Sequence, residues 1–358
     1  MTSDLVQNGA ADVFGHPWLS GSFADAEVMA LWSPERQLAN MLAFEAAFSR
    51  AMGRAGLFDA DLADEAASRI ETATPDMAAL RKGQENDGVV VPALVAELKK
   101  ATGHASEAVH KGATSQDVID TAMILSLRDT LRLLRARLER LQDAMDTLVQ
   151  VYGAKPLMGR TRMQAATEIT VADRIAPWMM PLATHIERID ALMPRVARVQ
   201  LGGASGDRKA LKDKAAMVSA DMAQALDLED APRAWHAMRG SVTEAASLMA
   251  LITGTLGKMG QDICLMAQQG IDEIAMSGGG GSSAMPHKQN PVLPELLVTL
   301  ARFNAVQVSA MHQAMIHEQE RSGTAWTLEW MVLPQIAQAT GRATTAAQTI
   351  CERINRIG

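Results

Sequence analysis

Aromatic residues are scarce in this chain: they make up 4% of its 358 residues, with a single tyrosine. Sheet proteins draw on aromatic and β-branched residues in short alternating runs, so this scarcity disfavours a sheet fold. Cysteine is equally rare, and Cys264 and Cys351 provide neither a disulfide framework nor the spacing of metal ligands. Together these absences predict a helical protein of a reducing compartment, the cytoplasm.

Segments that would direct the chain to a membrane or to nucleic acid are also missing. No basic segment followed by an apolar run stands near the first residue, and no uncharged apolar stretch reaches the roughly 20 residues of a bilayer span. The 34 lysines and arginines are outnumbered by 41 aspartates and glutamates, which gives a net charge of −7. A chain this acidic, without a basic block, is a poor general binder of nucleic acid. We therefore expect neither a membrane nor nucleic acid as a partner.

Long helices with apolar seams are what the sequence does contain. Residues 114–151 include neither glycine nor proline, and Thr114 with Asp117 has the pattern of a capping box at the start. Apolar residues recur in this stretch at alternating spacings of three and four, as in a heptad seam, at Ile124, Leu127, Leu131, Leu134, Leu138, Leu141, Met145 and Leu148. A second seam has the same spacing, at Val242, Ala245, Met249, Ile252, Leu256, Met259, Ile263 and Met266.

Two further stretches complete the expected bundle. Residues 296–321 predict a third long helix, and residues 165–200 predict a mostly helical segment in which Pro177, Pro181 and Pro194 should introduce kinks or breaks. A helix near 40 residues spans about 60 Å, so such helices normally bury their seams against one another and against other subunits. We expect an elongated, oligomeric, all-α bundle over residues 111–358, preceded by an N-terminal helical domain over residues 1–110.

One segment is rich in glycine and points to chemistry. Four consecutive glycines, 278–281, continue into Ser-Ser-Ala-Met-Pro-His-Lys-Gln-Asn-Pro. A plain linker would not continue in this way, and a phosphate-binding P-loop would need Gly-Lys-Ser/Thr entering a helix. The remaining interpretation is a loop that closes over a ligand, with hydroxyl groups and a cation beside it.

Residues 281–290 match Gly-Ser-Ser-x-Met-Pro-x-Lys-x-Asn, the signature of the fumarase/aspartase superfamily, which the chain resembles over most of its length. Residues 110–117 (His-Lys-Gly-Ala-Thr-Ser-Gln-Asp) and 159–164 (Gly-Arg-Thr-Arg-Met-Gln) resemble the first and second conserved regions of that superfamily, in the expected order. The resemblance implies a long central helical bundle and a homotetramer in which three subunits build each active site. It also implies that the C-terminal helical domain of other members is shortened or missing in this chain.

Within the superfamily the chain most resembles the cofactor-free cycloisomerases that lactonise 3-carboxy-cis,cis-muconate in protocatechuate (β-ketoadipate) breakdown. The markers are residues 200–206, Trp235 with His236, and residues 317–330. Arg162 stands where β-eliminating lyases usually carry a histidine, which also favours a cycloisomerase. Two alternatives stay open: adenylosuccinate lyase or another lyase of the superfamily, and a non-catalytic structural protein on the same fold, as in the lens δ-crystallins.

The resemblance also implies roles for individual residues around a small polycarboxylate substrate, without a metal or other cofactor. Ser282 matches the serine that moves the proton. Substrate-binding positions are His110, Lys111, Thr114, Ser115, Thr161, Arg162, Gln164, Arg239, Ser283, Met285, Lys288 and Asn290, with Glu295, His236 and His317 as possible auxiliaries.

Structural roles remain open for several of these residues. Thr114 and Asn290 both suit helix capping, and Glu295 suits the first turn of a helix. An arginine such as Arg239 commonly lies on a helix surface, and a lone histidine is more often structural than catalytic.

Overall fold

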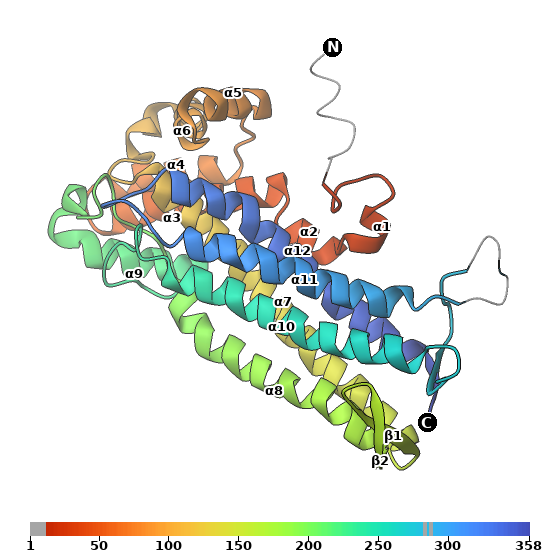
Figure 1. The fold of residues 1–358 in the computed structure, drawn as a ribbon. Helices are drawn as coiled ribbons and strands as arrows, with labels where there is room; N and C mark the ends of the chain where they lie inside the picture. Colours follow the sequence, from red (N-terminus) through yellow and green to blue (C-terminus); the bar gives the residue numbers. More distant parts are fainter. Residues whose placement is uncertain (1–11, 282–284, 286–288) are drawn as a thin grey trace.

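The computed structural model describes residues 12–281, 285 and 289–358. Within them the five longest helices of the central region lie side by side as an elongated bundle (Figure 1). They are α7 (Ser115–Tyr152), α8 (Val171–Val196), α10 (Gly240–Met266), α11 (Val292–Gln313) and α12 (Thr324–Arg353). The all-α fold expected from composition is confirmed.

The two predicted seams form the centre of this bundle. Every residue of the α7 seam is buried, as is every residue of the α10 seam, and both sets belong to one continuous apolar core. α7 begins one residue after Thr114, and the Asp117 carboxylate accepts a hydrogen bond from the Thr114 backbone N–H, as a capping box requires. The predicted start and seam of α7 are therefore confirmed.

The prediction for residues 296–321 is wrong at its end, because α11 stops at Gln313. Met315 is 41% exposed and Ile316 is 72% exposed, so the apolar residues beyond Ala314 have no core to pack against. Gln319 has a φ of 50°, which a continuing right-handed helix does not permit. The segment is instead a loop that leads into α12.

The prediction for residues 165–200 is corrected in two ways. Residues 164–170 form a strand, and α8 then continues through Pro177, Pro181 and Pro194 as one helix. These prolines lie on its exposed or half-buried side, whereas residues such as Ile175 and Leu182 face the core. The backbone carbonyl groups that lose their helical hydrogen bonds therefore lie away from the core. Water can bond to them there, so each missing hydrogen bond destabilises the helix least.

Two short antiparallel strand pairs lie at one end of the bundle, together with the last residue of the chain (Figure 1). β1 (Pro156–Thr161) and β2 (Gln164–Thr170) form a hairpin with a two-residue loop, because Thr161 pairs with Gln164. β3 (Ile274–Met276) pairs with β4 (Ile354–Ile357) next to the glycine-rich segment.

Smaller helices gather at the opposite end (Figure 1). They are α3 (Pro34–Arg54), α4 (Ala60–Glu71), α5 (Met77–Asp87), α6 (Val91–Thr102), α9 (Ala215–Leu226) and the 3₁₀-helices η1 (Gly103–Ala108) and η2 (Lys209–Lys214). Two short helices, α1 (Ser20–Phe23) and α2 (Ala26–Leu31), lie instead along the side of the bundle, where Asp25 pairs with Arg137 in the middle of α7. A second apolar core draws on α3 to α6, on α9 and on the first turns of α7. Residues on both sides of position 110 build this core, and the domain boundary there remains a prediction. No helix in the described part of the chain is long and apolar enough to cross a membrane.

Candidate functional site

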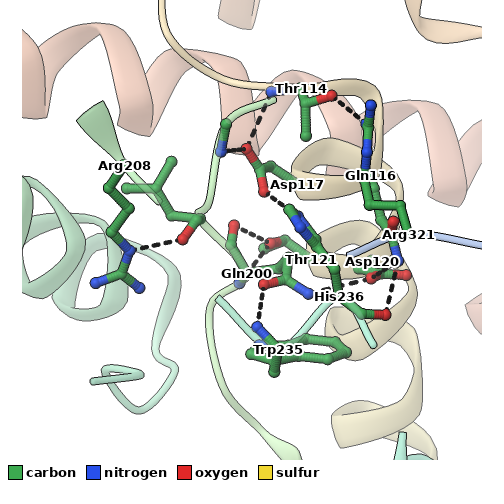
Figure 2. A network of polar contacts seen from close by, with 12 residues as sticks. Thr114, Gln116, Asp117, Asp120, Thr121, Gln200, Arg208, Trp235, His236 and Arg321 are labelled. Atoms are coloured by element: carbon green, nitrogen blue, oxygen red, sulfur yellow. Dashed lines mark hydrogen bonds and ion pairs between the residues drawn. The ribbon is translucent and has the colours of Figure 1, made fainter. Parts of the chain in front are cut away.

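The segment that leads into α7 is held by close backbone packing. Gly112 has a φ of 100° and Gly203 a φ of 69°, values that residues with a side chain rarely adopt. A Cβ atom on Gly203 would lie only 2.8 Å from the carbonyl oxygen of Gly112. Asp117 joins the segments that contain Gly112 and Gly203, because its Oδ2 accepts hydrogen bonds from the N–H groups of Thr114 at 3.0 Å and Gly203 at 2.9 Å. Figure 2 shows Asp117 directly beside Thr114.

The buried His236 contacts two residues in the first turn of α7, Asp117 and Gln116 (Figure 2). Its side chain is 2% exposed, and Nε2 lies 2.7 Å from Oδ1 of Asp117. Its backbone carbonyl accepts a hydrogen bond from the Gln116 side chain at 3.1 Å. These contacts give His236 a structural role, and the auxiliary role in catalysis remains a prediction.

Arg239 does not lie on a helix surface, because its side chain is buried within an ion cluster. It is 1% exposed, and its guanidinium lies between two buried carboxylates. Asp120 accepts hydrogen bonds from Nη1 at 2.7 Å and Nη2 at 3.1 Å, while Glu329 accepts from Nε at 2.9 Å and also from Nη2. Burial alone would lower the pKa of Arg239, but the two carboxylates outweigh it and raise the pKa. Arg239 is therefore a buried cation whose charge is paired within the chain, and its role in substrate binding remains a prediction.

His317 lies beside the same ion cluster. Its side chain is buried, and Nε2 is 3.7 Å from Oε1 of Glu329. Neither ring nitrogen has a hydrogen-bond partner among the described residues. An auxiliary role for His317 in the reaction remains a prediction.

Arg321 is a neighbour of the candidate site that the sequence interpretation missed. Its Nη1 donates a hydrogen bond to the Thr114 hydroxyl at 2.6 Å, and no ion pair of Arg321 exists within the described residues (Figure 2). Ser115 is half-buried and begins α7 immediately beside this contact. Nothing in the spacing of residues marks Arg321, because its approach to Thr114 depends on how the loop before α12 folds back.

His110 and Lys111 complete this end of the site. Nδ1 of His110 lies 2.6 Å from Oε1 of Glu45, a fully buried carboxylate on α3. Burial of His110 lowers its pKa, but the neighbouring Glu45 carboxylate outweighs this effect, so the pKa is raised above its usual value. Nζ of Lys111 lies 5.4 Å from the centre of the Phe58 ring, a cation–π contact. Cationic groups and hydroxyls therefore gather just before α7.

The second predicted segment is exposed at the far end of the bundle. Thr161 and Gln164 flank the hairpin loop, whose two residues, Arg162 and Met163, have φ values of 50° and 66°. α7 has 38 residues and separates this hairpin from Thr114 by about 57 Å, at 1.5 Å per residue. A single chain therefore cannot bring the first and second segments together at one substrate.

The glycine-rich loop shares the end of the bundle where the hairpin lies. Gly280 and Asn290 close its base, with backbone hydrogen bonds of 3.1 and 2.9 Å in the two directions. Three predicted site residues, Ser282, Ser283 and Lys288, lie outside the described residues. Met285 and Asn290 line a hollow of about 760 Å³ next to the loop.

The structure also decides the local roles considered for two residues near this loop. Asn290 does not cap α11, because the N-cap residue is Pro291 and no side chain makes a capping hydrogen bond there. Glu295 lies in the first turn of α11, where a carboxylate is favoured by the helix dipole. Its role beside a substrate remains a prediction.

Comparison with known proteins places the chain in a family. The family described as lyase matches residues 22–308. The chain belongs to this lyase family. It is 36% identical to the 3-carboxy-cis,cis-muconate cycloisomerase of Pseudomonas aeruginosa over 333 residues, which are 91% of this chain and 72% of that protein. It is 32% identical to the N-acetyl-S-(2-succino)cysteine lyase of Enterococcus italicus over 324 residues, 89% of this chain and 70% of that protein.

Solved structures agree with the assignment to the lyase family. The crystal structure of the 3-carboxy-cis,cis-muconate lactonizing enzyme from Pseudomonas putida superposes with a TM-score of 0.90 at 35% identity. The match covers 95% of this chain and 77% of that enzyme. The fumarase/aspartase resemblance and the fold expected from it are thereby confirmed.

Proposed function

We propose that this chain is a cycloisomerase that converts 3-carboxy-cis,cis-muconate to a carboxymuconolactone. The observation that carries the proposal is the similarity to cycloisomerases of that name, which extends over nine-tenths of the chain in sequence and in structure. Lyases of the same family are similar over a comparable length, at 32–34% identity against 34–38% for the cycloisomerases. The arginine at position 162, where the β-eliminating lyases usually carry a histidine, favours the cycloisomerase.

The reaction requires one C–O bond and one C–H bond to form. A substrate carboxylate adds to a conjugated double bond, and the carbon next to another carboxylate takes up a proton. Negative charge concentrates in that carboxylate as the reaction proceeds, so cations and hydrogen-bond donors must lie around it. In this proposal Ser282 donates the proton and regains one from solvent, while Lys288, Arg162 and His110 bind the carboxylates.

We further infer that the active enzyme is a homotetramer in which different chains supply the three segments. The length of α7 supports this inference, because it keeps the hairpin and Thr114 far apart within one chain. A partner chain that runs alongside in the opposite direction would bring its hairpin next to the first segment of this chain. We place this assembly in the cytoplasm, where the two cysteines stay reduced.

An ultraviolet assay with freshly prepared 3-carboxy-cis,cis-muconate tests the function. Lactonisation breaks the conjugation of the diene, so its absorbance should fall, and the lactone should be identified as the product. Ser282→Ala is the matched variant: it should lose turnover by about 10²–10⁴-fold while its helicity and oligomeric mass stay unchanged.

Either of two outcomes would change the assignment. Near-normal turnover by the Ser282→Ala variant would remove this serine from the chemistry. No loss of absorbance with folded, oligomeric wild-type protein would contradict the cycloisomerase, and adenylosuccinate would be the next substrate to test.

A further inference from the structure

A buried acid on α3 has no assigned role, although it contacts one of the candidate substrate-binding residues. Glu45 is fully buried, and Nδ1 of His110 is the only hydrogen-bond partner of its carboxylate within the described part of the chain. The second oxygen, Oε2, is buried and has no partner among the described residues. A buried carboxylate with a single hydrogen bond lowers the stability of the folded protein unless a positive charge lies beside it. A positive charge on the His110 ring is therefore the most direct way to stabilise Glu45.

The backbone of His110 is also held in an unusual conformation. Its φ is 59°, a left-handed value that residues with a side chain rarely adopt. Ser49, four residues after Glu45 and on the same face of α3, donates a hydrogen bond to the carbonyl oxygen of Ala108 at 2.9 Å. Two side chains of one helix therefore fix the segment from Ala108 to His110, one through the backbone and one through the imidazole ring.

The other ring nitrogen of His110 is available to a ligand. Nε2 has no hydrogen-bond partner among the described residues, and the side chain remains 17% exposed. Lys111 and Thr114, both candidate substrate-binding residues, lie within four positions along the chain. With Nδ1 directed to Glu45, Nε2 is the nitrogen that can donate to a substrate carboxylate.

We propose that Glu45 is a positioning residue that holds the His110 ring as an imidazolium and orients its Nε2–H to bind a carboxylate of the substrate. This rests on the proposed function, in which His110 binds substrate. Other charges near the ring act in both directions: Asp117 at the start of α7 also favours the protonated ring, whereas Lys99 on α6 opposes it, and Lys111 adjoins it in sequence.

The proposal has a defined pH dependence. The pKa of His110 is raised in the folded protein. The pair of His110 and Glu45 therefore contributes its full stabilisation at pH values below about 6.5, the pKa of histidine in the unfolded chain. It is lost as the pH rises through the folded pKa. Substrate affinity should follow the same window, strong while the ring is charged and weaker above it.

The first measurement needs no substrate. Exchange of the His110 ring C2 proton, followed by mass spectrometry of its peptide across a pH series, measures the pKa of this residue. We expect a value above 6.5 in the wild type and a value below it in the Glu45→Gln variant. Glu107→Gln is the matched control, because it removes an exposed carboxylate three residues from His110 while Glu45 stays in place. Equal His110 pKa values in wild type and Glu45→Gln would overturn the proposal.

The second measurement separates charge from position. Glu45→Gln should raise KM for 3-carboxy-cis,cis-muconate about tenfold near pH 7.5, with a smaller effect on kcat, and lower pH should restore KM. Glu45→Asp keeps the charge on a shorter side chain, so it should retain a raised pKa, and it replaces the Gln variant if that variant does not fold. A KM for Glu45→Gln that is unchanged, or that pH does not restore, would contradict the positioning role. An inactive wild type would contradict the proposed function alone, since the exchange measurement stands without substrate.

Discussion

At the scale of single residues, Arg239 shows why a candidate ligand-binding cation must be judged by its surroundings. Its side chain follows Trp235 by four residues, and the guanidinium carbon lies 4.9 Å from the centre of that ring. With Asp120 and Glu329 on its remaining sides, the cation compensates two buried anions. Removing it would leave both carboxylates without their counter-ion inside the protein, where an unpaired charge is costly.

We expect Arg239→Met to lower the free energy of unfolding by about 3–5 kcal/mol, as is typical when one partner of a buried ion pair is removed. Urea titration followed by circular dichroism measures the loss. Arg135→Met is the control, because Arg135 contacts Asp190 and Glu139 on the exposed surface and its loss should change stability little. If Arg239→Met were as stable as the control but had a raised KM, Arg239 would be a substrate-binding cation and not a structural one.

The residue contacts also show the limits of sequence interpretation. The pairing of Thr114 with Asp117 was predictable, because a capping box depends on a spacing of three residues within one helix. The contacts of His110 with Glu45 and of Thr114 with Arg321 join residues 65 and 207 positions apart. No local rule finds such pairs, since the fold alone brings them together.

At the scale of elements, the long helices were predictable and the hairpin was not. A seam repeated over eight positions gives a strong signal for α7 and for α10, and both formed as expected. The hairpin lacks the usual signal, because its two-residue loop holds Arg162 and Met163 where Asn-Gly is favoured. Positive φ values at residues with side chains indicate strain, which proteins retain mainly at functional positions.

The strain at Met163 can be tested without touching the charge of Arg162. Glycine adopts a positive φ at no steric cost, so Met163→Gly should raise the free energy of unfolding by about 0.5–1 kcal/mol. Met158→Gly, in strand β1 of the same hairpin, should instead lower it by about the same amount, because glycine weakens a strand. Thermal and urea unfolding of both variants provide the comparison. Destabilisation by both would mean that the exposed Met163 side chain makes stabilising contacts in the assembled protein that exceed the strain.

At the scale of the whole molecule, the candidate site is divided between the two ends of the bundle. The first segment lies beside the small helices, whereas the hairpin and the glycine-rich loop lie at the other end. Arg160 of the hairpin pairs with Glu273, one residue before β3, at 3.0 Å, which ties the hairpin to the strand leading into the loop. A substrate that needs both ends must therefore lie between chains.

Mixing two inactive variants tests this division directly. Thr114→Ala damages the first segment and Arg162→Ala the hairpin, so each variant on its own should have low cycloisomerase activity. If different chains supply the two segments, dissociation and reassembly of an equal mixture should restore about a quarter of the sites, since each segment is intact with a one-in-two chance. A mixture of Thr114→Ala with His110→Ala, both in the first segment, is the control and should recover nothing. Equal activity in the two mixtures would show that one chain supplies both segments, against the separation that α7 imposes.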